Sequence, residues 1–155
     1  MTTADANERP SVRVRRLPHG VDVPLPAPAT SGSAGHDVCS AEADFVLLPG
    51  ARRAVGTGLV FELPLGIEMQ VRPRSGLALK HGITVLNAPG LIDSGYRGEI
   101  RVVLLNTDPR NAFTVEPGMR IAQLVIAPVA AVRLLEVDEL AVSERGGQGF
   151  GSSAH

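Results

Sequence analysis

The chain has 155 residues, of which 44% are hydrophobic and 20% charged, so it is long enough to bury a core and too apolar for a disordered protein. Its net charge of −1 argues against binding to duplex nucleic acid, which needs a basic face to displace counterions, but permits small anionic ligands held by a few arginines. The single cysteine excludes a disulfide framework. The sequence shows no secretion leader and no apolar run of the ~18–20 residues that a membrane span needs, so we expect a cytoplasmic protein that does not span a membrane.

Short runs rich in β-branched residues, separated by glycine and proline, predict an all-β sandwich or barrel. Residues 1–11 are polar and aperiodic, which indicates a frayed terminus, and residues 18–33 hold four prolines, which indicates a loop. Helical turns are expected at residues 75–80, ending at Gly82, and at residues 138–141. Because no long helix is available to connect parallel strands, the sheets should be mostly antiparallel. The expected strands span residues 12–15, 44–48, 52–61, 67–72, 83–86, 99–105, 113–115, 121–126 and 132–137.

The last segment differs in character from the rest. Residues 143–153 contain four glycines and no apolar periodicity, which is typical of a floppy end. Arg145 and Phe150 nevertheless lie among these glycines. A cation, an aromatic face and unobstructed backbone N–H groups are what a flap that closes on a nucleotide would need. The residues alone leave both interpretations open.

Several familiar site types are excluded by their spacing. There is no phosphate-binding loop of the GxxxxGK[ST] type, and His36 and Cys39 supply only two of the three or four protein ligands that zinc takes. Ser75 has no histidine placed as a base, and we expect it to cap the helical turn that follows. Polar residues do gather at strand ends and turns, but each alone is explained by a turn or a solvated face: Asp37, Arg74, Ser75, Asp93 and Gln123.

Taken in order, five segments carry a specific pattern. They are AGHDVCSA at 34–41, PRSGLA at 73–78, GLIDSGYRGEI at 90–100, GMRIAQLV at 118–125 and RGGQGFGSS at 145–153. Together they resemble the five ordered motifs of the trimeric dUTPase family, over about residues 24–153. The resemblance implies a distorted, mostly antiparallel jelly roll of residues 1–142, a flexible C-terminal arm of residues 143–155, and a homotrimer with sites at its subunit interfaces.

The resemblance also implies an activity, the hydrolysis of dUTP to dUMP and pyrophosphate with Mg²⁺, which supplies dUMP and keeps uracil out of DNA. Asp93 corresponds to the carboxylate that orients and deprotonates the water attacking the α-phosphorus, and Tyr96 to the ring beneath the deoxyribose. Asp37 corresponds to a carboxylate that reaches the metal through water, while substrate phosphates hold most of the ion. The other implied substrate contacts are Asn87, Leu91 and Ile92 in the nucleoside pocket, Arg74, Ser75, Gly76 and Gln123 on the phosphate side, Arg101 on a strand, and Arg145, Phe150, Gly151 and Ser152 in the closing arm.

Two alternatives remain beside this hypothesis. A related deoxycytidine triphosphate deaminase would carry a segment richer in Arg and Glu around the second motif, whereas PRSGLA together with Tyr96 favours the dUTPase pattern. A non-enzymatic interaction module with the same fold would have no use for Asp93 or for the arm. The chain departs from the family at Val38, where Leu is usual, and at Ser153-Ala154-His155, where many relatives read Thr or Ser and then Gly.

Overall fold

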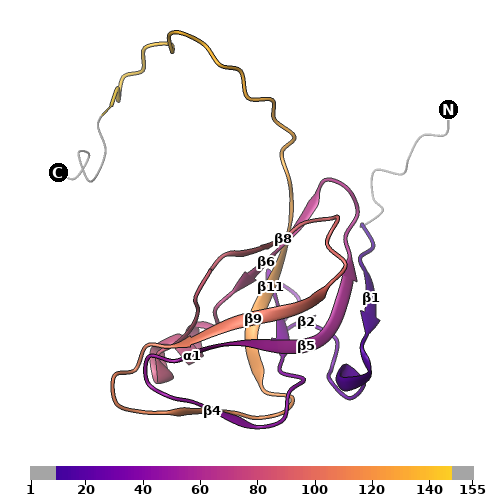
Figure 1. The fold of residues 1–155 in the computed structure, drawn as a ribbon. Helices are drawn as coiled ribbons and strands as arrows, with labels where there is room; N and C mark the ends of the chain where they lie inside the picture. Colours follow the sequence, from indigo (N-terminus) through magenta and orange to yellow (C-terminus); the bar gives the residue numbers. More distant parts are fainter. Residues whose placement is uncertain (1–9, 148–155) are drawn as a thin grey trace, which may run out of the picture.

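The computed structural model describes residues 10–147, which form three sheets and one short α-helix (Figure 1). Every strand pair in this part of the chain is antiparallel, so the expected all-β, antiparallel fold is confirmed. No helix in these residues is long and apolar enough to cross a membrane. The elements are β1 (Arg13–Arg16), a 3-10 turn (Pro18–Gly20), β2 (Ala27–Pro28), β3 (Gly35–Cys39), β4 (Phe45–Leu47), β5 (Arg52–Glu62), β6 (Ile67–Arg72), α1 (Ser75–His81), β7 (Ile83–Val85), β8 (Gly90–Ile92), β9 (Glu99–Asn106), β10 (Phe113–Val115) and β11 (Arg120–Pro128).

The core lies between two sheets and is aliphatic. One sheet has the order β1-β5-β9-β7 and the other β2-β3-β11-β6-β8, while β4 and β10 pair separately. Alternate residues of β9 point inward, which buries Ile100, Val102 and Leu104 completely. They pack with Leu59 of the same sheet and Leu124 of the other. Truncating one of these side chains to alanine leaves a cavity and costs about 2–5 kcal/mol of unfolding free energy.

The helix after β6 follows the expected position with one correction. α1 extends to His81 and ends at Gly82, whose left-handed φ of 65° lets its N–H donate to the carbonyl of Ala78 at 3.1 Å. The expectation that Ser75 caps this helix is wrong, because Arg74 occupies the capping position and no side chain makes a capping hydrogen bond. Ser75 is the first helical residue, and its hydroxyl is left for other contacts.

Three short strands were not expected. β3 and β8 each contain a glycine and show no clear alternation, and β2 lies within the predicted loop of residues 18–33 together with the 3-10 turn. Their extended form follows from partners elsewhere: β3 pairs with β11 and β2, and β8 pairs with β6. Strand propensity depends on such context, so local sequence gives little signal here.

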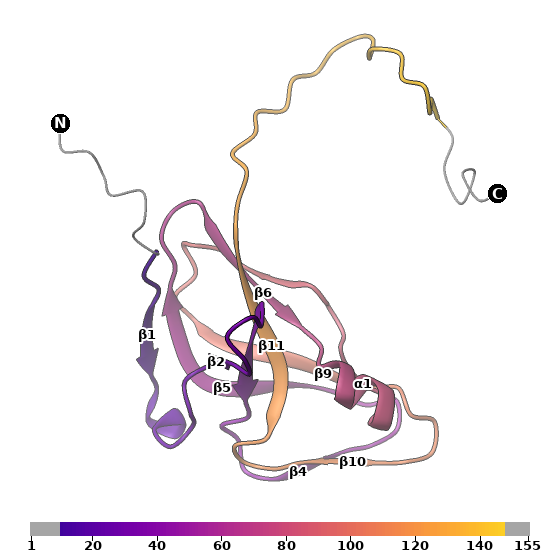
Figure 2. The ribbon, with the colours of Figure 1, turned by 180° about the vertical axis from the view of Figure 1, so that it is seen from behind.

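The predicted strand at residues 132–137 and the helical turn at 138–141 are both wrong. Residues 129–143 contain neither helix nor strand and leave the body as an extended segment (Figures 1 and 2). Its apolar side chains are exposed, with Val132 at 78%, Leu134 at 93% and Leu140 at 86%. Alternation makes a segment suitable for a sheet, but a strand needs a partner for its backbone groups, and the single chain offers none in its described part.

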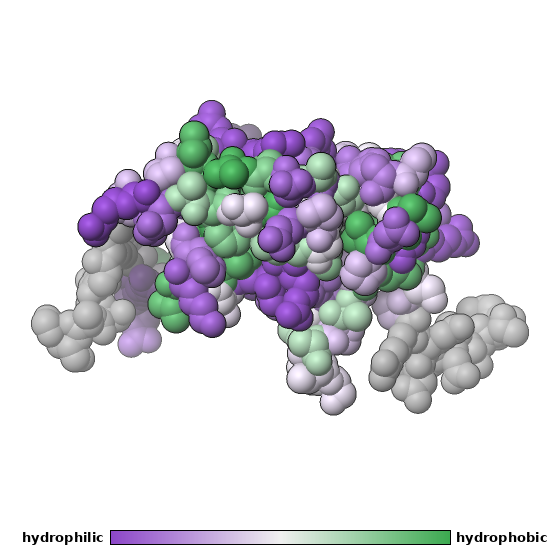
Figure 3. Space-filling view, turned by 90° about the horizontal axis from the view of Figure 1, so that it is seen from below, coloured by the Kyte–Doolittle hydropathy of each residue, from purple (hydrophilic) through white to green (hydrophobic). Residues whose placement is uncertain are grey.

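Seen from the end that carries α1 and β4, the surface mixes hydrophilic and hydrophobic residues (Figure 3). Exposed large apolar side chains are frequent along residues 129–142. Seven Val and Leu residues there are at least half exposed: Val129, Val132, Leu134, Leu135, Val137, Leu140 and Val142. These side chains have no cover within the part of the chain that the structure describes.

Candidate functional site

One group of expected site residues meets around the carboxylate of Asp37 on β3. Its Oδ1 accepts hydrogen bonds from Arg74 Nε at 3.1 Å and from Gln123 Nε2 at 3.3 Å, and its Oδ2 accepts one from Arg120 Nη1 at 3.2 Å. Strand register explains the meeting, since β11 lies between β3 and β6 and pairs Gln123 with Asp37 on one side and with Arg72 on the other. We call these four residues, Asp37, Arg74, Arg120 and Gln123, the Asp37 cluster.

The Asp37 cluster carries excess positive charge. Asp37 is largely buried, with a side chain 11% exposed, while the side chains of Arg74 and Arg120 are 25% and 59% exposed. Two guanidinium groups share one carboxylate, and each keeps N–H donors beyond those used on Asp37. Charged, forked donors of this kind suit the oxygens of a phosphate chain. The cluster therefore has the charge and the hydrogen-bond donors that binding of an anion requires.

Arg120 was not among the expected site residues, although it lies in the fourth motif. Residues three apart on a regular strand point to opposite faces, so Arg120 and Gln123 should not meet one carboxylate. The register between β11 and β3 shifts between Arg120 and Ala122, and this irregularity turns Arg120 toward Asp37. The sequence contains no signal for such a shift.

Ser75 and Gly76 extend the Asp37 cluster toward α1. Both follow Arg74 directly and are exposed at the start of the helix. A Cβ built on Gly76 would meet nothing within 4 Å, so its backbone is open to a ligand. Ser75 and Gly76, which the family resemblance assigns to the phosphate side, thus lie beside the cationic side chains.

The same region bears on the metal. Three of the about four acceptor positions of Asp37 are occupied, and no three His, Cys, Asp or Glu side chains within residues 10–147 are grouped to hold an ion. Mg²⁺ keeps several waters and binds mainly substrate phosphates, so Asp37 fits the expected contact through water. Burial and the charge of Asp37 raise the pKa of the Cys39 thiol, which keeps it protonated and unsuited as a ligand or nucleophile.

A second group of expected residues lies on the segment from Asn87 to Tyr96. Leu91 and Ile92 belong to β8, and Asp93 follows directly, at the start of a turn closed by a hydrogen bond from Tyr96 N–H to the Asp93 carbonyl at 3.0 Å. The Asn87 side chain approaches the same segment, because a Cβ on Gly90 would lie 3.1 Å from its Nδ2. We call this stretch, residues 87–96, the Asp93 segment.

The Tyr96 ring is held against the backbone of its own turn. Its hydroxyl donates to the carbonyl of Glu99 at 3.1 Å, and a Cβ on Gly98 would come within 2.3 Å of that hydroxyl oxygen. Only glycine leaves room for the ring there. Tyr96 remains 45% exposed, so the ring is a fixed aromatic face that a ligand can contact.

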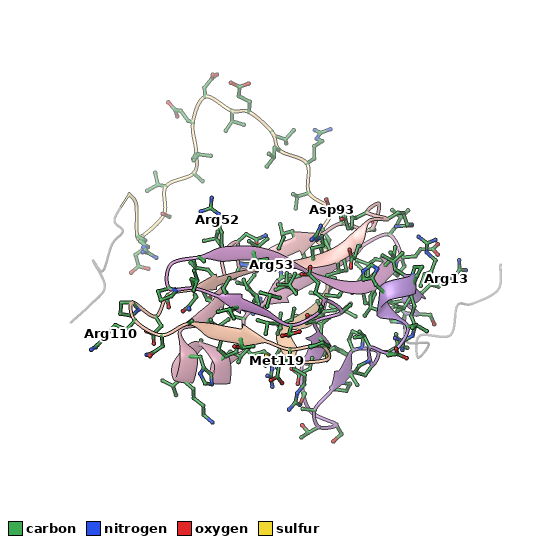
Figure 4. The ribbon with its side chains drawn as sticks, turned by 60° about the horizontal axis from the view of Figure 1, so that its bottom comes forward. Arg13, Arg52, Arg53, Asp93, Arg110 and Met119 are labelled. Carbon is green, nitrogen blue, oxygen red and sulfur yellow. The ribbon has the colours of Figure 1, made fainter. Side chains whose placement is uncertain are left out.

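Asp93 and the Asp37 cluster lie toward opposite ends of β6, because the Asp93 segment runs antiparallel along this strand from Gly90 beside Val71 to Ile92 beside Met69. The pairing of Met69 with Ile92 places Asp93 beside Glu68, and both line a cleft of about 300 Å³ that Val129 and Ala131 also border. Glu68 and Arg72 are four residues apart, about 13 Å along the strand, and Arg74 lies beyond. Figure 4 places Asp93 on the side where the extended segment leaves and Met119, the neighbour of Arg120, on the other side.

The remaining expected residues join neither group. Arg101 on β9 donates to the carbonyl of Ala54 at 3.0 Å and lies 3.6 Å from Glu42, so among the described residues it does not reach either half. Arg145 is exposed near the end of the extended segment. Phe150, Gly151 and Ser152 lie outside the described residues.

Comparisons of the sequence and of the structure with known proteins all find dUTPases. A dUTPase family model matches residues 22–154. The deoxyuridine 5'-triphosphate nucleotidohydrolase of Sinorhizobium medicae is 51% identical over 151 residues, which cover 96% of this chain and 94% of that protein. The protein of the same name from Methylocella silvestris is 53% identical over 146 residues, covering 92% and 91%. The solved structure of the Staphylococcus bacteriophage 80alpha dUTPase with dUPNHPP has a TM-score of 0.84 and 29% identity, covering 94% of this chain and 99% of that one.

Proposed function

The chain belongs to the dUTPase family, and we propose that it hydrolyses dUTP to dUMP and pyrophosphate at sites shared between copies of the chain. The observation that supports a shared site is the separation of Asp93 from the Asp37 cluster along β6. A base must lie within about 2.6–3.2 Å of the water it deprotonates, and that water must touch the phosphorus whose oxygens the arginines hold. One chain therefore holds the two halves of different sites.

In this proposal Asp93 is the general base. It removes a proton from the water as the water's oxygen attacks the α-phosphorus, and pyrophosphate leaves with the electrons of the broken P–O bond. Arg74 and Arg120 neutralise charge on the phosphates, while Ser75 and the backbone of Gly76 donate hydrogen bonds to phosphate oxygens. Charge neutralisation and positioning dominate phosphoryl chemistry, so a dense metal cage is not needed. Mg²⁺, held by the phosphates and contacting Asp37 through water, would supply further neutralisation.

Base and sugar selection belong to the Asp93 segment. Asn87 and the backbone at Leu91 and Ile92 would hydrogen-bond uracil, and Tyr96 would lie beneath the deoxyribose, where a 2′-hydroxyl does not fit. A site built to hydrogen-bond one base edge rejects another by ~10⁴ or more in kcat/KM. We expect that discrimination against dCTP, and a more than about tenfold preference for dUTP over dTTP and UTP. Equal cleavage of any of the three would contradict this role for the pocket.

Release of pyrophosphate and ammonia distinguishes the candidate activities. We expect pyrophosphate from dUTP in the presence of Mg²⁺ and no ammonia from dCTP. Ammonia from dCTP would identify a deaminase, and no product from either nucleotide would identify an interaction module.

The single, buried cysteine suits the reducing cytoplasm, where we place the enzyme.

We propose a homotrimer as the assembly that completes the sites. The exposed apolar side chains of residues 129–142 support association, because they have no cover in a single chain. Val129 and Ala131 at the start of this segment line the same cleft as Asp93, so a contact with another chain along the segment would lie beside the proposed base. Residues 143–155 would then reach a neighbouring site as the closing arm. Light scattering should give the mass of three chains, whereas an active monomer would contradict the proposal.

Subunit mixing tests the shared site directly. We expect Asp93→Asn and Arg74→Met each to be nearly inactive alone, because each removes one half of every site. In co-refolded mixed trimers, about a quarter of the sites combine an intact Asp93 with an intact Arg74 from a neighbour, so about that share of activity should return. If both halves of a site came from one chain, mixing would restore nothing.

A further inference from the structure

An irregular stretch of β5 lies where β9 begins. Gly56 pairs with Arg101 and Val60 with Glu99, so the four-residue step on β5 faces a two-residue step on β9 and residues 57–59 bulge out of the ladder. Gly58 takes a left-handed φ of 67° in this bulge and packs on Gly20, where a Cβ would approach the Gly20 Cα to 2.3 Å. The ladder therefore does not hold the first residues of β9 in the usual way.

Two side chains link the start of β9 to the bulge: the Thr57 hydroxyl, which donates to the Ile100 carbonyl at 2.7 Å, and the Glu99 carboxylate. Its Oε1 accepts the Gly58 N–H at 2.8 Å and contacts His19 Nε2 at 2.8 Å, and the side chain is 19% exposed. Burial acts to raise the pKa of Glu99, but the hydrogen bonds from His19 and Gly58 and the charges of His19 and Arg101 outweigh it, so its pKa lies below the ordinary value. The ionised carboxylate thus joins the start of β9 to the bulge and to the 3-10 turn.

The turn that carries Asp93 and Tyr96 is attached at this point. Arg97 Nη1 donates to the carbonyls of Ser94 at 2.6 Å and Tyr96 at 2.8 Å, so its bonds stiffen the turn internally without tying it to the sheets. The Tyr96 hydroxyl, by contrast, donates to the backbone carbonyl of Glu99. Besides its attachment to β8, the turn is therefore tied to residue 99 through the ring of Tyr96.

We propose that Glu99 is a positioning residue for Tyr96, and that its carboxylate, held by Gly58 and His19, fixes the ring that selects deoxyribose. The proposal rests on the proposed role of Tyr96 in the dUTPase reaction. Glu99 touches no reacting atom: it acts through its own backbone carbonyl and the phenol bound to it. Removing the carboxylate leaves the Thr57 hydroxyl on the Ile100 carbonyl to hold the next residue of β9, but it frees residue 99 from Gly58 and His19, and the ring bound to residue 99 loses its fixed position.

The chain permits a test that does not depend on activity, because Tyr96 is its only tyrosine and it contains no tryptophan. Tyrosine fluorescence, its quenching by acrylamide and the near-ultraviolet tyrosine dichroism therefore report on this ring alone. In Glu99→Ala we expect easier quenching and loss of the dichroic band. Glu62→Ala, which removes a carboxylate at the end of β5 that pairs with Arg13 of β1, should match the unmodified protein.

The second measurement is specificity. We expect Glu99→Ala to lower the ratio of kcat/KM for dUTP to that for UTP by about tenfold, with the trimer intact. A folded Glu99→Ala variant with unchanged Tyr96 fluorescence and an unchanged ratio overturns the proposal. A changed fluorescence with an unchanged ratio retains the positioning by Glu99 and overturns the role of Tyr96 in sugar selection. If Glu99→Ala does not fold, Glu99→Gln and His19→Ala each disturb part of the contact, and unchanged fluorescence in both overturns the positioning role.

Discussion

Replacing Asp93 by asparagine should lower kcat by ~10²–10⁴-fold, the usual contribution of a positioned general base. Asparagine keeps the size and most of the hydrogen bonding of aspartate but cannot take the proton of the attacking water. The side chain lies at the start of a turn whose geometry depends on the backbone carbonyl of Asp93 and not on its carboxylate. The fold of the turn should therefore survive the substitution.

Binding and chemistry separate in this variant. We expect the Kd of a non-hydrolysable dUTP analogue to stay close to that of the unmodified enzyme while kcat and kcat/KM fall together, because the lost interaction exists only in the transition state. Asp44→Asn is a matched control, since Asp44 is an exposed carboxylate outside both halves of the site. Unaltered turnover in Asp93→Asn would show that another group accepts the proton.

Sequence patterns predicted the elements whose signal is local. The strict alternation of Ile67–Arg72 marks a half-buried strand, and Gly82 marks the end of α1 because only a left-handed residue fits there. The strand Gly35–Cys39 has no such signal, since its extended form comes from pairing with β11. Residues 132–137 show the converse, because they alternate like a strand but lack a partner within one chain.

Several residues of the candidate site were predictable from the sequence, but their arrangement was not. The ordered motifs identify Asp37, Arg74 and Gln123 as separate contacts. Strand register brings the three side chains together in one cluster. Arg120 joins that cluster because of a register shift between β11 and β3, and no residue type in the sequence predicts this shift. The distance of Asp93 from the cluster follows from the antiparallel pairing of β8 with β6, a long-range fact.

Deletion of the chain after Val142 should lower kcat by two or more decades and change dUTP affinity by less than about tenfold, or ~1.4 kcal/mol. The deletion removes Arg145 and Phe150 but leaves both halves of the site and residues 129–142 in place. Fixing a glycine-rich arm costs ~1–2 kcal/mol of backbone entropy per residue. Stacking of Phe150 on uracil returns ~1–3 kcal/mol, and hydrogen bonds from Arg145 to phosphate ~1.5–3 kcal/mol.

These gains offset the entropy of fixing only about two to four residues, so closure of the whole arm adds little or no affinity in the ground state. Its value lies in the transition state, where an arginine on a transferring phosphoryl chain accelerates reaction by ~10³–10⁵ in other enzymes. Arg145→Lys separates charge from geometry: lysine keeps the charge but loses the planar fork, so most of the loss in kcat should persist. Single-turnover kinetics with the truncated and Arg145→Lys enzymes measure the effect on chemistry. The truncated enzyme contains none of the arm. If it forms a trimer with normal kcat, the arm has no catalytic role.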